Sequence, residues 1–318
     1  MKTIIKKLVH EPTQFSPEDA ERAMHQIMQG SATSSQISAF LISLKLQEKD
    51  KDPQVVAACA TAMRSHACLV PYDHHPQLVG QVVDIVGTGG DGHDTYNVST
   101  TASIVAAGAG AKVAKHGNRA ASSRSGSADL MEAHGCAITQ VEPYQHVAKL
   151  RKEIAVPTVF NLLGPMSNPA KPSRMVVGVH SPEIGALMAN ALRLTGVQEG
   201  LVVCGAEGLD EISPAGETHY WRIDGNDIKT GRTYPLSQVK GGDCHENAHI
   251  LNQLLNNQLS DEDPILNFVL LNTSALLVMA GIASDFKEGV EKARESIKSG
   301  NAKRVLESFR DETRKEKR

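Results

Sequence analysis

The sequence lacks the features that mark several common classes of protein. Its formal net charge is only −3 over 318 residues, so it has no excess of the basic residues that nucleic-acid-binding proteins use to hold phosphates. Its five cysteines are scattered without a C-x-x-C pair, which predicts free thiols in a reducing compartment and a cytoplasmic protein. The N-terminal stretch, residues 1–7, is too short and too charged to form the apolar region of a signal peptide.

Long apolar runs are scarce, and only one needs a membrane test. Residues 265–283 approach the roughly 18–20 residues of a membrane-spanning helix. The stretch contains Asn267 and Asn272, and acidic rather than basic residues precede it, unlike the usual flanks of a spanning segment. We therefore expect a buried core helix and no membrane partner.

The chain has the length of about two domains, and its two parts have different patterns. Residues 1–72 show apolar residues at helical spacing; Ser16 begins a typical helix start, Ser35 is expected to cap a second helix, and residues 55–63 suggest a third. Residues 73–318 alternate between strand and helix patterns, which predicts an α/β domain with a mostly parallel sheet flanked by helices. The expected strands are 82–86, 112–114, 175–179 and 201–204, with 218–223 as an antiparallel addition; the expected helices are 102–109, 184–194, 246–257, 264–283 and the chain from 286 onward.

The most informative stretch is the glycine-rich run 84–92, which is followed by residues 97–100 and an apolar segment. This order predicts a strand, a tight loop and the start of a helix, where backbone N–H groups and the helix dipole bind phosphate. The run is neither a Walker A sequence nor G-x-G-x-x-G. A plain strand-to-helix turn is the alternative, and a phosphorylated substrate is the interpretation that we pursue.

Two further stretches carry polar groups that suit such a substrate. Residues 115–119 and 122–127 place an ammonium, an imidazole, an amide, guanidinium groups and hydroxyls close together, which fits an anion with many oxygens. The pair Asp210 and Glu211 follows a predicted strand, at the edge where open α/β sheets bind ligands. Beside a phosphate loop, these carboxylates predict a Mg²⁺ site. Solvated loops are the alternative for both stretches.

A second metal motif points to a different chemistry. His245, Glu246 and His249 match H-E-x-x-H, which on a helix would place two imidazoles on one face, as in zinc hydrolases. The match is short and lacks the further histidine that extends the motif in one large class of zinc hydrolases. A zinc hydrolase is therefore kept as a remote alternative.

Taken in order along the chain, these motifs resemble those of the anthranilate phosphoribosyltransferase family. The resemblance implies transfer of phosphoribose from 5-phosphoribosyl 1-pyrophosphate to anthranilate, which gives N-(5-phosphoribosyl)anthranilate and pyrophosphate in tryptophan biosynthesis. It also implies Mg²⁺, a homodimer, and a helical domain that includes a returning piece at about 163–195. The matching stretches are 87–91, 97–100, 115–119, 160–165 with 168–169, 208–211, and 241–243 with 246–248.

The resemblance also implies roles for individual residues, without a general base. The residues that would bind the phosphoribosyl donor are Gly87, Gly89, Gly90, Asp91, Asn97, Ser99, Thr100 and Lys115. The residues that would lie by the acceptor, anthranilate, are Gly87, Asn118, Arg151, Gly164 and Pro165. The residues that would hold Mg²⁺ are Ser99, Asp210 and Glu211.

One segment departs from the family pattern. Residues 136–150 replace a longer stretch that normally supplies a helix, a strand and a His-Pro pair by the acceptor. Tyr144 and His146 are poor substitutes for that pair. The alternatives that follow from this shortening are a non-catalytic relative and a relative that uses another acceptor.

Overall fold

The computed structural model describes residues 1–120, 124–138, 150, 153–223 and 236–315. The chain divides into two compact units. Unit 1 comprises Met1–Pro71, Gln140–Lys171 and Ala186–Val197, and unit 2 comprises Tyr72–Thr139, Pro172–Gly185 and Gln198–Arg318. The predicted returning piece, 163–195, is therefore divided, because residues 174–178 inside it form a central strand of the sheet in unit 2.

Unit 1 is built from helices, as predicted. Its elements are α1 (Lys2–His10), α2 (Pro17–Met28), α3 (Ser34–Leu46), η1 (Lys49–Lys51), α4 (Pro53–Ser65), α8 (Phe160–Leu163) and η3 (Gly164–Met166). Ser16 caps α2 as expected. The prediction for α3 was wrong by two residues: Thr33 is its N-cap, not Ser35, because only Thr33 stands three residues before Gln36, whose side chain returns the hydrogen bond.

Unit 2 contains a four-stranded sheet in the order β1-β2-β3-β4. β1 (Val83–Gly87), β2 (Arg174–Gly178) and β3 (Glu199–Gly205) are parallel, and β4 (Thr218–Ile223) is antiparallel to β3. The fold class is thus confirmed. The predicted strand 112–114 is reduced to a single parallel bridge between Val113 and Val83. Because β1, β2 and β3 run the same way, their carboxyl ends meet at one edge of the sheet.

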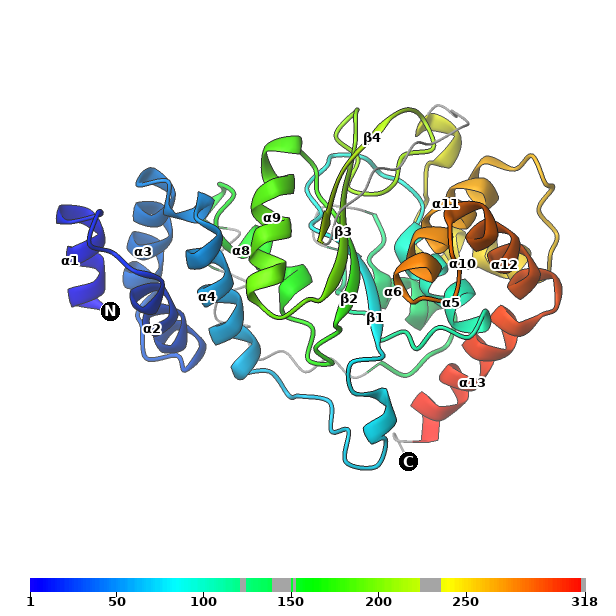
Figure 1. Ribbon diagram of the computed structural model, residues 1–318, viewed down its shortest axis with the longest axis horizontal. Helices are drawn as coiled ribbons and strands as arrows, with labels where there is room; N and C mark the ends of the chain where they lie inside the picture. The colour runs from blue at the N-terminus through cyan, green and yellow to red at the C-terminus, as the bar shows by residue number, and fades with distance from the viewer. Residues whose placement is uncertain (121–123, 139–149, 151–152, 224–235, 316–318) are drawn as a thin grey trace. The chain divides into compact units, whose positions relative to one another are not determined.

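The helices of unit 2 bury one face of this sheet, as Figure 1 shows. They are α5 (Val98–Gly108), α6 (Ser127–Ala133), α10 (Cys244–Leu255), α11 (Pro264–Met279), α12 (Phe286–Lys298) and α13 (Asn301–Lys315), with η2 (Pro76–Leu78) and η4 (Leu236–Val239) between elements. α9 (Pro182–Leu194) follows β2. α11 is almost wholly buried in the core, as its apolar sequence predicted. In the described part of the chain, no helix has the length and apolar character needed to cross a membrane.

Candidate active site

The turn after β1 is shaped by glycines. Gly89 and Gly90 have φ of 70° and 84°, in the left-handed region that glycine adopts without strain. The Thr88 N–H donates to the carbonyl of Gly178 at the end of β2, at 2.9 Å. The Gly89 N–H donates to Asp210 Oδ2 at 2.7 Å. The turn is therefore fixed against two other segments at the carboxyl edge of the sheet.

The acid pair that the sequence singled out is buried at this same edge. Asp210 and Glu211 are only 9% and 8% exposed, although adjacent acids are ordinarily solvated. Burial, followed by the charge of Asp91, raises the pKa of Asp210 to about 7. Burial, followed by the charge of Asp210, raises the pKa of Glu211 well above its usual value. Two carboxyl groups are thus held where their negative charge is poorly compensated.

Lys115 supplies a positive charge to the same cluster. Its Nζ donates to the carbonyls of Ile85 at 2.7 Å and His116 at 3.3 Å, so two of its three N–H donors are fixed by backbone. Burial lowers the pKa of Lys115, while Asp84, Glu211 and Asp210 oppose that shift. Predicted donor and metal residues thus lie together around the end of β1.

The acid pair fits a hard divalent cation. The Ser99 hydroxyl lies near enough to Glu211 to lower the pKa of that carboxyl in part, so the two carboxylates and the hydroxyl that were predicted as ligands lie in one region. Among the described residues, no three His, Cys, Asp or Glu side chains are grouped to hold a metal by themselves. Mg²⁺ does not need such a cage, since it usually takes one or two carboxylates and completes its shell with water and substrate phosphates.

The first turn of α5 faces this cluster through Ser99, and a side-chain network sets where the helix begins. Asn97 is the N-cap residue of α5, but its side chain does not cap the helix. Its Nδ2 donates to the carbonyl of Ser125 at 2.8 Å, and its Oδ1 accepts from Asn247 Nδ2 at 2.8 Å. Asn97 thus ties the start of α5 to two other segments, and its role in donor binding stays a prediction. The uncapped N–H groups of α5 remain suited to an anion.

Asn247 is a site residue to which sequence reasoning gave no role. It is 1% exposed, and its side chain both accepts from the Gly242 N–H at 2.8 Å and donates to the Gly242 carbonyl at 3.2 Å. It thereby ties Asn97 to the segment before α10. The glycine pair 241–242 with Asn247 was visible in the family motif, but its pairing with a residue 150 positions away was not.

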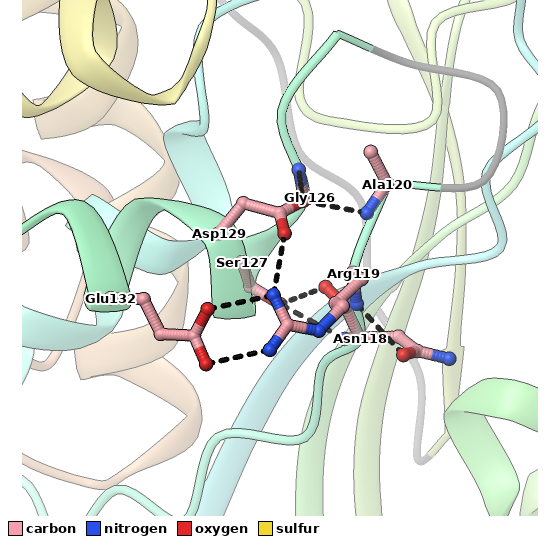
Figure 2. A network of polar contacts seen from close by, with 7 residues as sticks. All are labelled: Asn118, Arg119, Ala120, Gly126, Ser127, Asp129 and Glu132. Atoms are coloured by element: carbon pink, nitrogen blue, oxygen red, sulfur yellow. Dashed lines mark hydrogen bonds and ion pairs between the residues drawn. The ribbon is translucent and has the colours of Figure 1, made fainter. Parts of the chain in front are cut away.

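Residues 117–120 pack closely against Gly126 and the start of α6. A Cβ on Gly117 would lie 1.9 Å from Ser127 Oγ, and one on Gly126 would lie 2.4 Å from the Ala120 nitrogen. Arg119, counted among the anion-binding groups, instead pairs with Glu132 of α6 (Figure 2). Arg119 and both glycines thus have structural contacts here, and a part for this stretch in anion binding stays a prediction.

The predicted acceptor residues are distributed over several parts of the chain. Asn118 belongs to unit 2, whereas Gly164 and Pro165 begin η3 in unit 1. Pro165 is buried, and space is open around Gly164 where a Cβ would stand. Arg151 and most of the shortened segment lie outside the described residues. The acceptor roles therefore stay predictions.

The H-E-x-x-H stretch has a structural explanation. Glu246 lies in the first turn of α10, where its carboxylate accepts from the Asp243 N–H at 2.8 Å in a capping box. Its Oε2 also lies 3.7 Å from the Arg124 guanidinium. Glu246 thus helps to begin α10. Nothing in the described residues favours a zinc hydrolase.

The raised pKa of Asp210 gives a pH-dependent prediction. Between its usual pKa of 3.8 and about 7, the folded protein binds more protons at this site than the unfolded chain. Protonation of Asp210 therefore raises the free energy of unfolding as the pH falls through 7, and this contribution is lost as the pH rises. We expect a higher Tm at about pH 6 than at about pH 8 in metal-free protein, and a larger increase in Tm on adding Mg²⁺ at the higher pH.

Scanning calorimetry with and without Mg²⁺ measures both effects. The Asp210→Asn variant is the control, because it removes the titrating group, so its Tm should depend less on pH. An increase in Tm with Mg²⁺ that is equal at both pH values would contradict the assignment of Asp210 to the cation.

Comparison with known proteins places the chain in a family of enzymes. The profile of the glycosyl transferase family a/b domain matches residues 79–143 and 136–303, and that of the family's helical bundle domain matches residues 2–67. The anthranilate phosphoribosyltransferase of Schizosaccharomyces pombe is 39% identical, with 96% of each chain covered. That of Symbiobacterium thermophilum is 38% identical, with 98% of each covered.

Solved structures agree with these relatives. The anthranilate phosphoribosyltransferase from Saccharomyces cerevisiae in complex with PRPP and Mg has a TM-score of 0.88 at 33% identity, over 99% of this chain and 98% of that one. The enzyme from Thermus thermophilus has a TM-score of 0.88 at 36% identity, over 98% of this chain and 99% of that one. The two matches of the a/b domain overlap at residues 136–143, within the shortened segment.

Proposed function

The chain belongs to the anthranilate phosphoribosyltransferase family, and we propose that it transfers phosphoribose from 5-phosphoribosyl 1-pyrophosphate to anthranilate. The products are N-(5-phosphoribosyl)anthranilate and pyrophosphate. One observation carries this proposal above the others: the buried pair Asp210 and Glu211 lies against the glycine turn after β1. Mg²⁺ is the cofactor, as the complex of the yeast relative with PRPP and Mg supports.

The donor is held by backbone and charge. Its diphosphate is placed on the turn 87–91 and at the uncapped start of α5, where N–H groups and the helix dipole favour anions. Ser99, Asp210 and Glu211 hold Mg²⁺, which when bound neutralises charge on the diphosphate. Lys115 adds a fixed positive charge beside the leaving pyrophosphate. Departure of pyrophosphate leaves positive charge on the ribose ring. The nearby carboxylates of Asp210 and Glu211 are compatible with that charge.

The acceptor requires less chemical activation. Anthranilate attacks through an uncharged aromatic amine, so we assign no general base and attribute most of the catalysis to positioning and electrostatics. Asn118, Gly164 and Pro165 are proposed to lie by anthranilate. Arg151 is proposed to pair with its carboxylate, for which a guanidinium offers a two-pronged hydrogen bond.

We also propose a cytoplasmic homodimer. All five cysteines are free, which suits a reducing compartment. The dimer rests on the family resemblance alone.

A fluorescence assay tests the proposed function. Protein incubated with Mg²⁺, phosphoribosyl pyrophosphate and anthranilate should deplete anthranilate fluorescence, and omission of any one component should stop the depletion. Retained donor binding without depletion would instead indicate a non-catalytic relative, in which the shortened segment 136–150 has removed the acceptor site. Turnover with a different aromatic amine would indicate a changed acceptor.

A further inference from the structure

A network of charged side chains joins the segment after Lys115 to α6, as Figure 2 shows. The Nη1 and Nη2 atoms of Arg119 donate to the two carboxylate oxygens of Glu132, each at 2.7 Å. Nη1 also lies 3.2 Å from Asp129 Oδ1. This two-pronged geometry fixes the guanidinium plane, which a single point contact would not do. We call Arg119, Asp129 and Glu132 the Arg119 clamp.

Asp129 extends the clamp to the backbone on both sides of the segment. Its Oδ2 accepts from the Ala120 N–H at 2.8 Å and from the Gly126 N–H at 2.9 Å. Burial raises the pKa of Asp129, but these N–H groups and Arg119 lower it overall. The carboxylate is therefore charged near neutral pH and tied to the backbone of Ala120 and of Gly126.

Asn118 stands immediately before Arg119, and its backbone is held by the start of α6. Its N–H donates to Ser127 Oγ at 3.1 Å, and its carbonyl accepts from that hydroxyl and from the Ala128 N–H, both at 3.2 Å. Its side-chain oxygen accepts from the Arg119 N–H at 2.7 Å. The position of Asn118 thus depends on the same helix to which Arg119 is paired.

We propose that Arg119 is a positioning residue for the acceptor: the Arg119 clamp holds the backbone that presents Asn118 to anthranilate. The proposal rests on the proposed function, in which Asn118 contacts the acceptor. Arg119 acts on the α6 side of its own segment and has no place in donor binding.

The clamp contributes little to overall stability, so its loss can be tested in folded protein. The side chains of Arg119 and Glu132 are 43% and 32% exposed, and pairs this open to solvent ordinarily contribute about 1 kcal/mol or less. A small displacement of a substrate-contacting group can nevertheless cost a large factor in reaction rate or affinity. Activity and stability should therefore separate.

Steady-state kinetics on a graded series test the proposal. Arg119→Met should raise the KM for anthranilate by about five- to tenfold, the effect of one hydrogen bond lost or misplaced, with the KM for the donor within about twofold of wild type. The anthranilate KM of Arg119→Lys should lie between those of wild type and Arg119→Met, because an ammonium cannot span both carboxylate oxygens. The Tm of each variant should stay within a few degrees of wild type, about the shift for 1 kcal/mol.

A double variant shows whether the effect passes through Glu132. Glu132→Gln alone should also raise the acceptor KM, and Arg119→Met with Glu132→Gln should be no worse than Arg119→Met alone, because both remove one interaction. Arg294→Met is the matched control, since Arg294 pairs with exposed Asp261 in the same unit and lies outside the clamp. It should leave both KM values unchanged.

Three outcomes would overturn the proposal, and they differ from failure of the proposed function. An unchanged acceptor KM in Arg119→Met would remove Arg119 from positioning. Equal rises in both KM values would indicate general loosening, and additive effects in the double variant would separate Arg119 from Glu132. A wild-type protein that does not consume anthranilate would overturn the proposed function itself.

Discussion

Replacing both members of the buried acid pair should abolish turnover. In Asp210→Asn with Glu211→Gln, the side chains keep their size but lose the charge that holds Mg²⁺ beside the diphosphate. We expect kcat/KM to fall by about 10³-fold or more, since a metal contributes several kcal/mol to a developing charge and each 1.36 kcal/mol is tenfold in rate. The measurement is anthranilate consumption over a range of Mg²⁺ concentrations.

The chain offers a matched control for this variant. Asp261 and Glu262 are also adjacent acids but lie on the surface between α10 and α11, so Asp261→Asn with Glu262→Gln should leave the rate near wild type. At about pH 8 the metal-free Asp210→Asn, Glu211→Gln protein should unfold at or above the wild-type temperature, because it no longer buries uncompensated negative charge. Wild-type rates at limiting Mg²⁺ would remove these acids from the metal site.

A single methyl group at Gly178 should disturb both the fold and the site. A Cβ at this position would lie 1.6 Å from the backbone oxygen of Asp210 and 2.3 Å from its carbonyl carbon. These are backbone atoms and cannot rotate away. We expect Gly178→Ala to cost about 3 kcal/mol, at the upper end for overpacking, which lowers Tm by roughly 6–12 °C and weakens stabilisation by Mg²⁺ because Asp210 is displaced.

Gly216→Ala is the control for that substitution. Gly216 lies in the same unit, and nothing stands within 4 Å of the position of its Cβ. Thermal unfolding of the two variants, with and without Mg²⁺, separates the specific contact from a general effect of alanine. A Tm for Gly178→Ala equal to that for Gly216→Ala would contradict the packing of Asp210 on β2.

Local patterns predicted the elements of this fold well because their causes are local. The Ser16 cap, the apolar strands and the buried character of α11 each depend on residues within a few positions. The acid pair could be placed because parallel strands end at a common edge of the sheet. The choice of Thr33 over Ser35 as a cap depended on one side chain, Gln36, and was missed.

Long-range pairings could not be read from the sequence. Arg119 and Glu132 are charged residues of the kind that usually lie on a solvated surface, and only the position of α6 brings them together. Asn97 and Asn247 are 150 positions apart, and no local spacing relates them. Gly178 had a weaker signal, since a glycine in a strand indicates close approach of another backbone, but its neighbour, Asp210, follows from the topology alone.

A crystal structure with phosphoribosyl pyrophosphate and Mg²⁺ bound would locate the donor and the cation. We expect the diphosphate to lie on the turn 87–91 and at the start of α5, with Asp210 and Glu211 on the cation. The donor bound at another place, with that turn empty and the acid pair free of metal, would contradict it.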